Sequence, residues 1–126
     1  MIGVVELKSK SIVRGDIYYV RGYLDAVGSE QKANGRSRPA IVISNNIGNK
    51  YSKIKQVVYI TTKNKNEIPT HVLINSAKYT SIAICEQIFS ISDERIGRYV
   101  GHCTEDEIKE LDKALMISIG LDENYK

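Results

Sequence analysis

Six short segments rich in β-branched and aromatic residues precede the one long helical pattern in this chain of 126 residues. Polar segments separate them, and they cover 16–24, 38–44, 56–62, 71–75, 82–91 and 98–103. This composition and spacing are typical of β-strands. Because no helices alternate with the strands, they predict an antiparallel sheet in an α+β fold. Strands this short and numerous indicate a sheet coiled into a small barrel.

The segment 104–121 is predicted to form one amphipathic helix that covers this barrel. Thr104 and Glu107 have the spacing of a capping box, and Gly120 with Leu121 predicts a Schellman-type end. Apolar residues recur on one helical face at Ile108, Leu111, Leu115 and Ile119. Elsewhere, the Asn- and Gly-rich segment 45–53 is predicted to be a turn, and 92–96 a single turn of helix.

The length and composition indicate a single globular domain. Hydrophobic residues make up 42% and charged residues 26% of the chain, as in ordinary soluble proteins. No apolar run approaches the ~20 residues that cross a bilayer, and the N-terminus lacks the pattern of a signal peptide, which favours the cytoplasm. We expect a lead-in at 1–13 that is disordered in part or adds an edge strand, one domain at 14–121 and a tail at 122–126.

Charge is distributed unevenly along the chain. Residues 1–65 contain 12 Lys and Arg against 4 Asp and Glu, whereas residues 66–126 contain 6 against 11, so charges of +8 and −5 give the net +3. A basic half indicates a polyanionic partner, and chance segregation on a solvated surface is an equally good explanation.

The two cysteines predict neither a disulfide framework nor a metal site. Cys85 lies in an apolar segment, which is typical of a buried, inert thiol. Cys103 follows His102, and adjacent residues on a strand point to opposite faces, so this pair is not expected to act as a nucleophile and base. No cluster has the histidine or carboxylate density of a catalytic metal site.

The polar segment GSEQKANGRSRP at 28–39 runs directly into an apolar strand and carries the most distinctive chemistry. It contains Glu30, Arg36 and Arg38, and it lies in the basic half of the chain, which also contains Thr61 and Thr62 at a strand end. Arginine offers a planar fork to phosphate oxygens, and threonine adds a hydroxyl donor. This combination suggests a site for a phosphodiester.

Several motifs resemble the MazF/PemK family of toxin endoribonucleases from type II toxin–antitoxin systems. They occur in the family's order across residues 14–121 and read RGDIYYV, GSEQ…RPAIVISNNIGNKYS, YITT, IPTHV, CEQI and LDKALMISIGL. The resemblance implies a homodimer whose protomer is an SH3-like barrel. It implies sequence-specific cleavage of single-stranded RNA, such as mRNA, without a metal or cofactor, by attack of the 2′-hydroxyl, giving 2′,3′-cyclic phosphate and 5′-hydroxyl ends. A cognate antitoxin would inhibit the enzyme.

The resemblance also implies roles for individual residues. Arg38 matches the family's catalytic arginine and Thr61 its catalytic threonine, while Glu30 and Gln87 match positions that line the same site in some members. Pro39 restricts Arg38 to an extended backbone, which favours Arg38 over Arg36 for the phosphate. Glu30 is either the general base or an exposed loop carboxylate.

Further residues are candidates for RNA binding. The loop between GSEQ and RP is about two residues longer than is usual in the family and adds Lys32 and Arg36 near Ser29. Lys50, with Lys53 and Lys55, is either a phosphate track or part of a soluble turn. Gln87 either reads a base edge or holds a loop.

Alternatives accompany some of these predictions. His71 could act as a general base, but a structural hydrogen bond at a strand start is the favoured interpretation. Glu86 and Gln87 are adjacent on a predicted strand, so only one of them is expected to face a given surface.

The alternative function is a toxin of the same fold that lacks a nuclease site and poisons a protein such as DNA gyrase through its C-terminal helix and tail.

Overall fold

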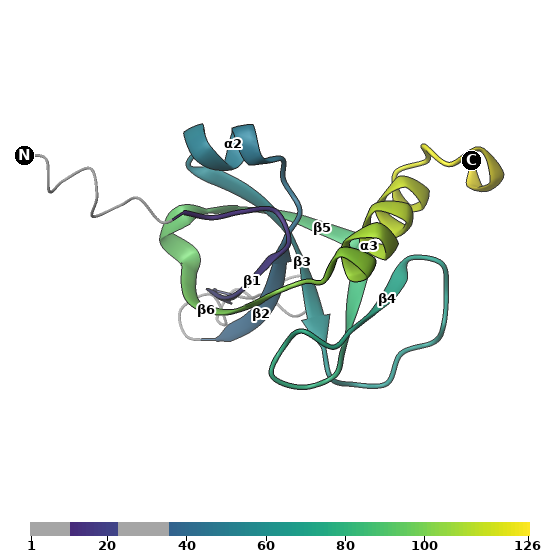
Figure 1. Ribbon diagram of the computed structural model, residues 1–126, viewed down its shortest axis with the longest axis horizontal. Coiled ribbons are helices and arrows are strands. Elements are labelled where there is room, and N and C mark those ends of the chain that lie inside the picture. Colours follow the sequence, from purple (N-terminus) through teal and green to yellow (C-terminus); the bar gives the residue numbers. More distant parts are fainter. Residues whose placement is uncertain (1–10, 23–35) are drawn as a thin grey trace, which may run out of the picture.

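The computed structural model describes residues 11–22 and 36–126, in which six antiparallel strands form one curved sheet (Figure 1). The spatial order of the strands is β4-β5-β3-β2-β1-β6. Their bounds are β1 Asp16–Arg21, β2 Ser37–Val42, β3 Ile54–Thr61, β4 His71–Ile74, β5 Ser81–Ser92 and β6 Ile96–His102. Each predicted strand segment overlaps one of these strands, which confirms the α+β class. Most of the lead-in, residues 1–10, lies outside the described residues.

The sheet is buried on both faces and encloses two apolar clusters. Neighbouring residues of the central strands alternate between them: Ile17 belongs to one cluster and Tyr18 to the other, as do Val58 and Val57. The second cluster draws side chains from five strands, which requires the sheet to coil into a barrel. Its members are Ile12, Tyr18, Val20, Ala40, Val42, Val57, Tyr59, Ile91 and Ile96.

Helix α3, Glu105–Ser118, covers the first cluster and packs against β4 and β5 (Figure 1). Leu111, Ala114 and Leu115 are its buried apolar residues. Both predicted ends are confirmed. Thr104 forms the capping box with Glu107. Gly120 adopts φ +80°, and the Gly120 and Leu121 amides donate to the carbonyls of Ile117 and Met116, which is the Schellman pattern.

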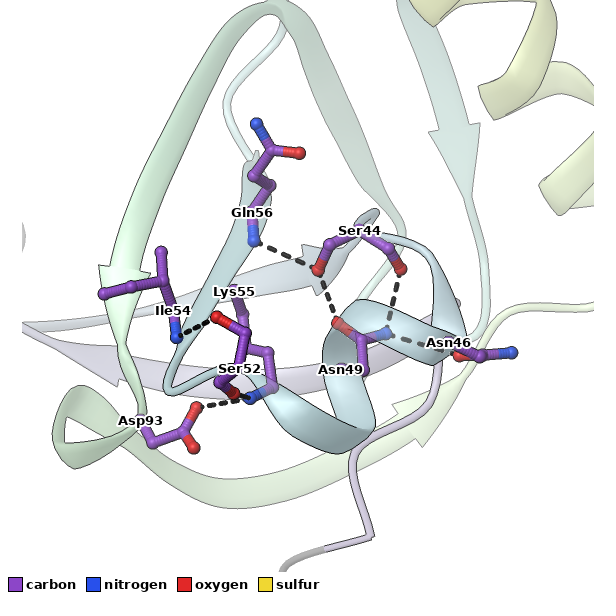
Figure 2. Close-up of polar contacts among 8 residues, drawn as sticks. All are labelled: Ser44, Asn46, Asn49, Ser52, Ile54, Lys55, Gln56 and Asp93. Atoms are coloured by element: carbon purple, nitrogen blue, oxygen red, sulfur yellow. Dashed lines mark hydrogen bonds and ion pairs between the residues drawn. The ribbon is translucent and has the colours of Figure 1, made fainter.

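The prediction of a turn at 45–53 is wrong, because Asn46–Tyr51 form helix α2. The Asn45 side chain caps this helix by accepting from the Gly48 amide at 2.7 Å. Figure 2 shows the buried Asn49 bound to Ser44, whose carbonyl accepts from Asn49 Nδ2 at 2.8 Å. Asn residues that suggested a turn therefore cap and anchor a short helix. The predicted single turn at 92–96 is confirmed by the 3-10 helix η2, Asp93–Arg95, and a further turn, η3, spans Glu123–Tyr125.

Lys55 is buried and therefore does not belong to a surface track of lysines. Its side chain is 2% exposed, and its Nζ donates to the Ser52 carbonyl and to Asp93 Oδ1 at 2.7 Å (Figure 2). The ion pair joins the start of β3 to η2. The Lys55 ammonium also satisfies the Ser52 carbonyl, which follows the last turn of α2. Lys55 is thus a structural cation.

Glu107 ties helix α3 to the segment that follows β4. Its carboxylate accepts from the Asn75 amide at 2.6 Å, the Ser76 hydroxyl at 2.6 Å and the Thr104 amide at 2.9 Å. Burial opposes ionisation of this side chain, but the hydrogen bonds outweigh burial and hold the pKa of Glu107 below its ordinary value.

Replacing Glu107 by Ala should lower the free energy of unfolding by about 3 kcal/mol at pH 7, because three donors lose an ionised acceptor. The folded pKa lies below the unfolded value of about 4.3. The contribution is therefore complete above that pH and is lost as pH falls through the folded pKa. Urea denaturation at pH 7 and pH 3 measures both effects. Glu110→Ala, an exposed change on the same helix, should alter stability by about 0.5 kcal/mol or less; equal losses in the two variants would contradict this role.

Replacing Asp93 by Asn should destabilise the fold more than replacing Lys55 by Met. The first change removes the negative charge beside a buried ammonium and leaves it only neutral acceptors, at a cost of about 1–2 kcal/mol given the partly exposed carboxylate. The second removes the buried charge and keeps most of the side-chain volume. Denaturant midpoints of the two variants at pH 7 provide the comparison. A lower midpoint for Lys55→Met than for Asp93→Asn would show that the ion pair does not stabilise the contact between β3 and η2.

Candidate active site

A surface pocket of about 230 Å³ gathers residues from four strands and one loop. Strand β2 contributes Arg38, and β3 contributes Thr61. The loop after β3 adds two lysines. Strand β4 contributes His71, and β5 forms the remaining wall of the pocket. The lining residues are Arg38, Tyr59, Ile60, Thr61, Lys63, Lys65, His71, Ile84, Glu86 and Gln87. Three residues named from the sequence, Arg38, Thr61 and Gln87, therefore lie together.

Arg38 is positioned by the strand that carries it. It pairs with Val20 of β1 in the antiparallel register, and Pro39 after it limits its backbone to extended conformations. The following residues, Ala40 and Ile41, are buried. The half-buried guanidinium is thus presented from a rigid strand rather than from the loop before it.

Thr61 is the last residue of β3 and pairs with Ile82 of β5. Its Oγ1 accepts from the Lys63 amide at 3.2 Å, which shapes the turn that leads to the two pocket lysines. A hydroxyl also has one hydrogen to donate. Thr61 can therefore hold the turn and donate to an oxygen in the pocket at the same time.

A register shift between β3 and β5 places both Glu86 and Gln87 in the pocket. Val58 pairs with Ile88, but Ile60 pairs with Ala83, so four residues of β5 stand opposite Tyr59 alone. Such a bulge interrupts the alternation of side chains along a strand. The expectation that only one of the two residues faces a given surface is therefore wrong.

His71 and Glu86 form a hydrogen-bonded pair at the pocket wall. His71 Nε2 lies 3.1 Å from Glu86 Oε2, and His71 Nδ1 lies 2.7 Å from the Asn66 carbonyl oxygen. Thr70 Oγ1 donates to Glu86 Oε1 at 2.7 Å. The predicted hydrogen bond of a strand-start histidine is confirmed. Burial of Glu86 opposes its ionisation, but donors from Thr70 and His71 outweigh burial and lower the pKa of the carboxyl below its ordinary value.

The charged lining of the pocket is mainly cationic. Arg38, Lys63 and Lys65 face a single carboxylate, that of Glu86. Both lysines were missed from the sequence, although they alternate directly after a strand that ends in threonine. Neighbouring cations of this kind attract an anion and stabilise charge that develops on it.

Other predicted residues lie elsewhere. Arg36 precedes β2, and its carbonyl accepts from the Gly22 amide at 2.8 Å; its side chain does not line the pocket. Lys50 is exposed on α2, where its Nζ lies 5.4 Å from the centroid of the Tyr51 ring. Ser29, Glu30 and Lys32 lie outside the described residues.

The cysteines have the properties of structural residues. Cys85 and Cys103 are buried free thiols, and burial raises the pKa of each to about 12. Within residues 11–22 and 36–126, no three His, Cys, Asp or Glu side chains are grouped so that they could hold a metal ion. The helices of the same ranges are all too short or too polar to cross a membrane.

Comparisons with known proteins agree on one family. Residues 13–119 match the family model described as PemK-like, MazF-like toxin of type II toxin–antitoxin system. Endoribonuclease EndoA of Bacillus subtilis (strain 168) is 36% identical in an alignment of 115 residues that covers 87% of this chain and 96% of that protein. An endoribonuclease from a mycobacterial species has a similar structure, with a TM-score of 0.73 and 23% identity, over 90% of this chain and 95% of that one. A mycobacterial endoribonuclease in complex with its cognate antitoxin gives a TM-score of 0.72 and 24% identity, over 87% and 96% of the two chains.

Proposed function

Because the chain belongs to the PemK-like, MazF-like toxin family of type II toxin–antitoxin systems, we propose that it is an endoribonuclease that cleaves single-stranded RNA at a short sequence. Its relative EndoA carries the name endoribonuclease and aligns over 87% of this chain. The substrate would be mRNA, and the site of action the cytoplasm.

The observation that carries this proposal is the meeting of Arg38 and Thr61 in one cationic pocket. The two residues come from β2 and β3, which are neighbours in the sheet. One offers a guanidinium and the other a hydroxyl from fixed backbone positions. A phosphodiester has two non-bridging oxygens that need such donors when negative charge accumulates on them.

In the proposed reaction the 2′-hydroxyl attacks the adjacent phosphorus and the bond to the 5′-oxygen breaks, which gives a 2′,3′-cyclic phosphate and a 5′-hydroxyl. Arg38 stabilises the phosphorane through two N–H donors, and Thr61 donates to a second oxygen. A guanidinium has a pKa above about 12 and is a poor proton donor, so the main role of Arg38 is electrostatic. The chain's own cations supply this charge, and we propose that no metal ion is required.

Substrate RNA would extend beyond the reacting phosphate along the cations of the pocket. Lys63 and Lys65 contact neighbouring phosphates, and the exposed Gln87 amide can both donate to and accept from a base edge. Ser29, Lys32, Arg36 and Lys50 are the further candidates for RNA contacts, and Glu30 for catalysis.

We also propose a homodimer and an inhibitory antitoxin. Large apolar side chains are exposed on the described surface, among them Ile47, Tyr51 and Leu73, and a second protomer would cover part of this area. The antitoxin would lay an acidic or apolar segment over the cationic pocket and exclude RNA. The alternative of a toxin that only poisons a protein target is less favoured, because it gives no reason for Arg38 and Thr61 to share a pocket.

Replacing Arg38 by Ala should lower the single-turnover rate of RNA cleavage by about 10²- to 10³-fold, because one fixed donor to the phosphorane is lost. Thr61→Val, which removes only the hydroxyl, should cost about 10²-fold. The measurement uses purified protein and a long, sequence-diverse transcript in EDTA, with analysis of product ends. Wild-type cleavage should survive EDTA and leave cyclic phosphates.

The matched control is Arg98→Ala. Arg98 is an exposed arginine that stacks 5.1 Å from the centroid of the Tyr19 ring and does not line the pocket, so cleavage should stay near the wild-type rate. If Arg36→Ala abolished cleavage while Arg38→Ala did not, the catalytic arginine would be Arg36. Intact RNA after incubation with folded wild-type protein would contradict the nuclease itself.

A further inference from the structure

The proposed cleavage leaves one proton transfer without a donor. When the bond from phosphorus to the 5′-oxygen breaks, that oxygen leaves as an alkoxide unless an acid protonates it. Arg38 is a poor acid, because a guanidinium has a pKa above about 12. The acid is therefore expected among the other residues that line the pocket.

Tyr59 lines the pocket from the interior of the barrel. It is 8% exposed and belongs to the second apolar cluster, yet it is also part of the pocket lining. Its ring packs edge-to-face on Phe89, with the two ring centroids 5.2 Å apart and an interplanar angle of 73°. A buried tyrosine usually places its ring among apolar groups and its hydroxyl against polar ones. The pocket provides Tyr59 with such a polar surrounding.

The strand register puts Tyr59 on the same face of the sheet as Arg38 and Thr61. Ala40 of β2 pairs with Tyr59 of β3. Side chains alternate along a strand, so Arg38, two residues before Ala40, and Thr61, two residues after Tyr59, share the face of that pair. Residues diagonal to each other across two antiparallel strands lie about 7–8 Å apart, within reach of long side chains. Tyr59 can therefore meet a phosphodiester that Arg38 and Thr61 hold.

The remaining candidates in the pocket are less suited to this role. Lys63 and Lys65 are exposed on the loop after β3, where their ammonium groups are hydrated and carried on flexible stems. Both ring nitrogens of His71 already have hydrogen-bond partners. A general acid works best when it is held in place before the reaction. The packed ring of Tyr59 meets that requirement.

We propose that the Tyr59 hydroxyl reaches this pocket and is the general acid of the RNA cleavage proposed above, on which this inference rests. As the 2′-oxygen bonds to phosphorus, the bond from phosphorus to the 5′-oxygen breaks and the phenol proton moves to that oxygen. The proton of the 2′-hydroxyl passes to Glu30 or to water, and the phenolate takes a proton back from water. Arg38, Lys63 and Lys65 line the same pocket and stabilise the phenolate while it lasts.

A substrate with a sulfur leaving group tests this role directly. Two forms of a short RNA that the wild-type protein cuts are compared in single turnover, one with the natural 5′-oxygen at the cleaved bond and one with sulfur in its place. A thiolate leaves without protonation, because a thiol is far more acidic than an alcohol. Tyr59→Phe removes only the hydroxyl and keeps the ring. It should slow cleavage of the oxygen RNA by about 10²-fold or more, and cut the sulfur RNA within about threefold of the wild-type rate.

Two variants are the matched controls. Tyr18→Phe removes the hydroxyl of the other tyrosine in the same cluster, which packs edge-to-face on Tyr99, donates to Asp16 and does not line the pocket. It should cleave both RNAs near the wild-type rate. Arg38→Ala should be slow on both RNAs, because the phosphorane needs its charge whichever atom leaves.

Phe89→Leu tests the same acid without changing it. The variant removes the ring that holds Tyr59, so the hydroxyl is in place for a smaller share of the time. Cleavage of the oxygen RNA should fall by about three- to tenfold, and sulfur should restore it. If Phe89 only supported the fold, both RNAs would be cut more slowly by the same factor.

Several results would overturn the proposal. Near wild-type cleavage of the oxygen RNA by Tyr59→Phe, with Arg38→Ala inactive, would remove Tyr59 from catalysis and leave the nuclease intact. Equal slowing of Tyr59→Phe on both RNAs would assign the hydroxyl to substrate binding or charge stabilisation. Rescue of Lys63→Met by sulfur, without rescue of Tyr59→Phe, would make the lysine the acid. Failure of the wild-type protein to cleave either RNA would overturn the proposed function itself.

Discussion

The register shift between β3 and β5 is the constraint on which the pocket depends. Strand β5 pairs with β3 on one side and β4 on the other, and the pairing with β3 gains three residues between Val58 and Ile60. The surplus residues turn Cys85 inward, where its amide donates to the Thr70 carbonyl, and leave Glu86 and Gln87 outward together. A regular strand would have sent one of these two side chains into the core. The bulge thus allows β5 to contribute two adjacent side chains to the pocket wall.

Rigid strands hold Arg38 and Thr61 at one end of the sheet. Arg38 is fixed by strand pairing and by Pro39, and Thr61 by its pairing with Ile82. The two buried clusters on either face keep these strands from shifting, because each central residue packs on one side or the other. Groups that must meet a developing charge gain most from such preorganisation, since nothing has to reorganise during the reaction.

Local signals in the sequence predicted most of the fold, and long-range pairing decided the rest. Thr104, Glu107 and Gly120 predicted both ends of α3 because caps depend on residues within one turn of each other. The helix at 46–51 was missed because asparagine and glycine favour turns and caps alike. Glu86 was underestimated for a different reason: period-two alternation holds only without a bulge, and the bulge arises from partners more than 20 residues away along the chain. Lys55 was considered a surface lysine because the sequence does not show that Asp93, 38 residues further along the chain, lies beside it.

A carboxylate in a pocket for a polyanion is costly unless its charge is balanced. Here Arg38, Lys63 and Lys65 line the same pocket, so three cations outnumber the one carboxylate of Glu86. Contacts with Thr70 and His71 hold the Glu86 carboxylate at the pocket wall, so its place relative to these cations is fixed. A polyanion therefore meets a pocket whose fixed charges are mainly positive.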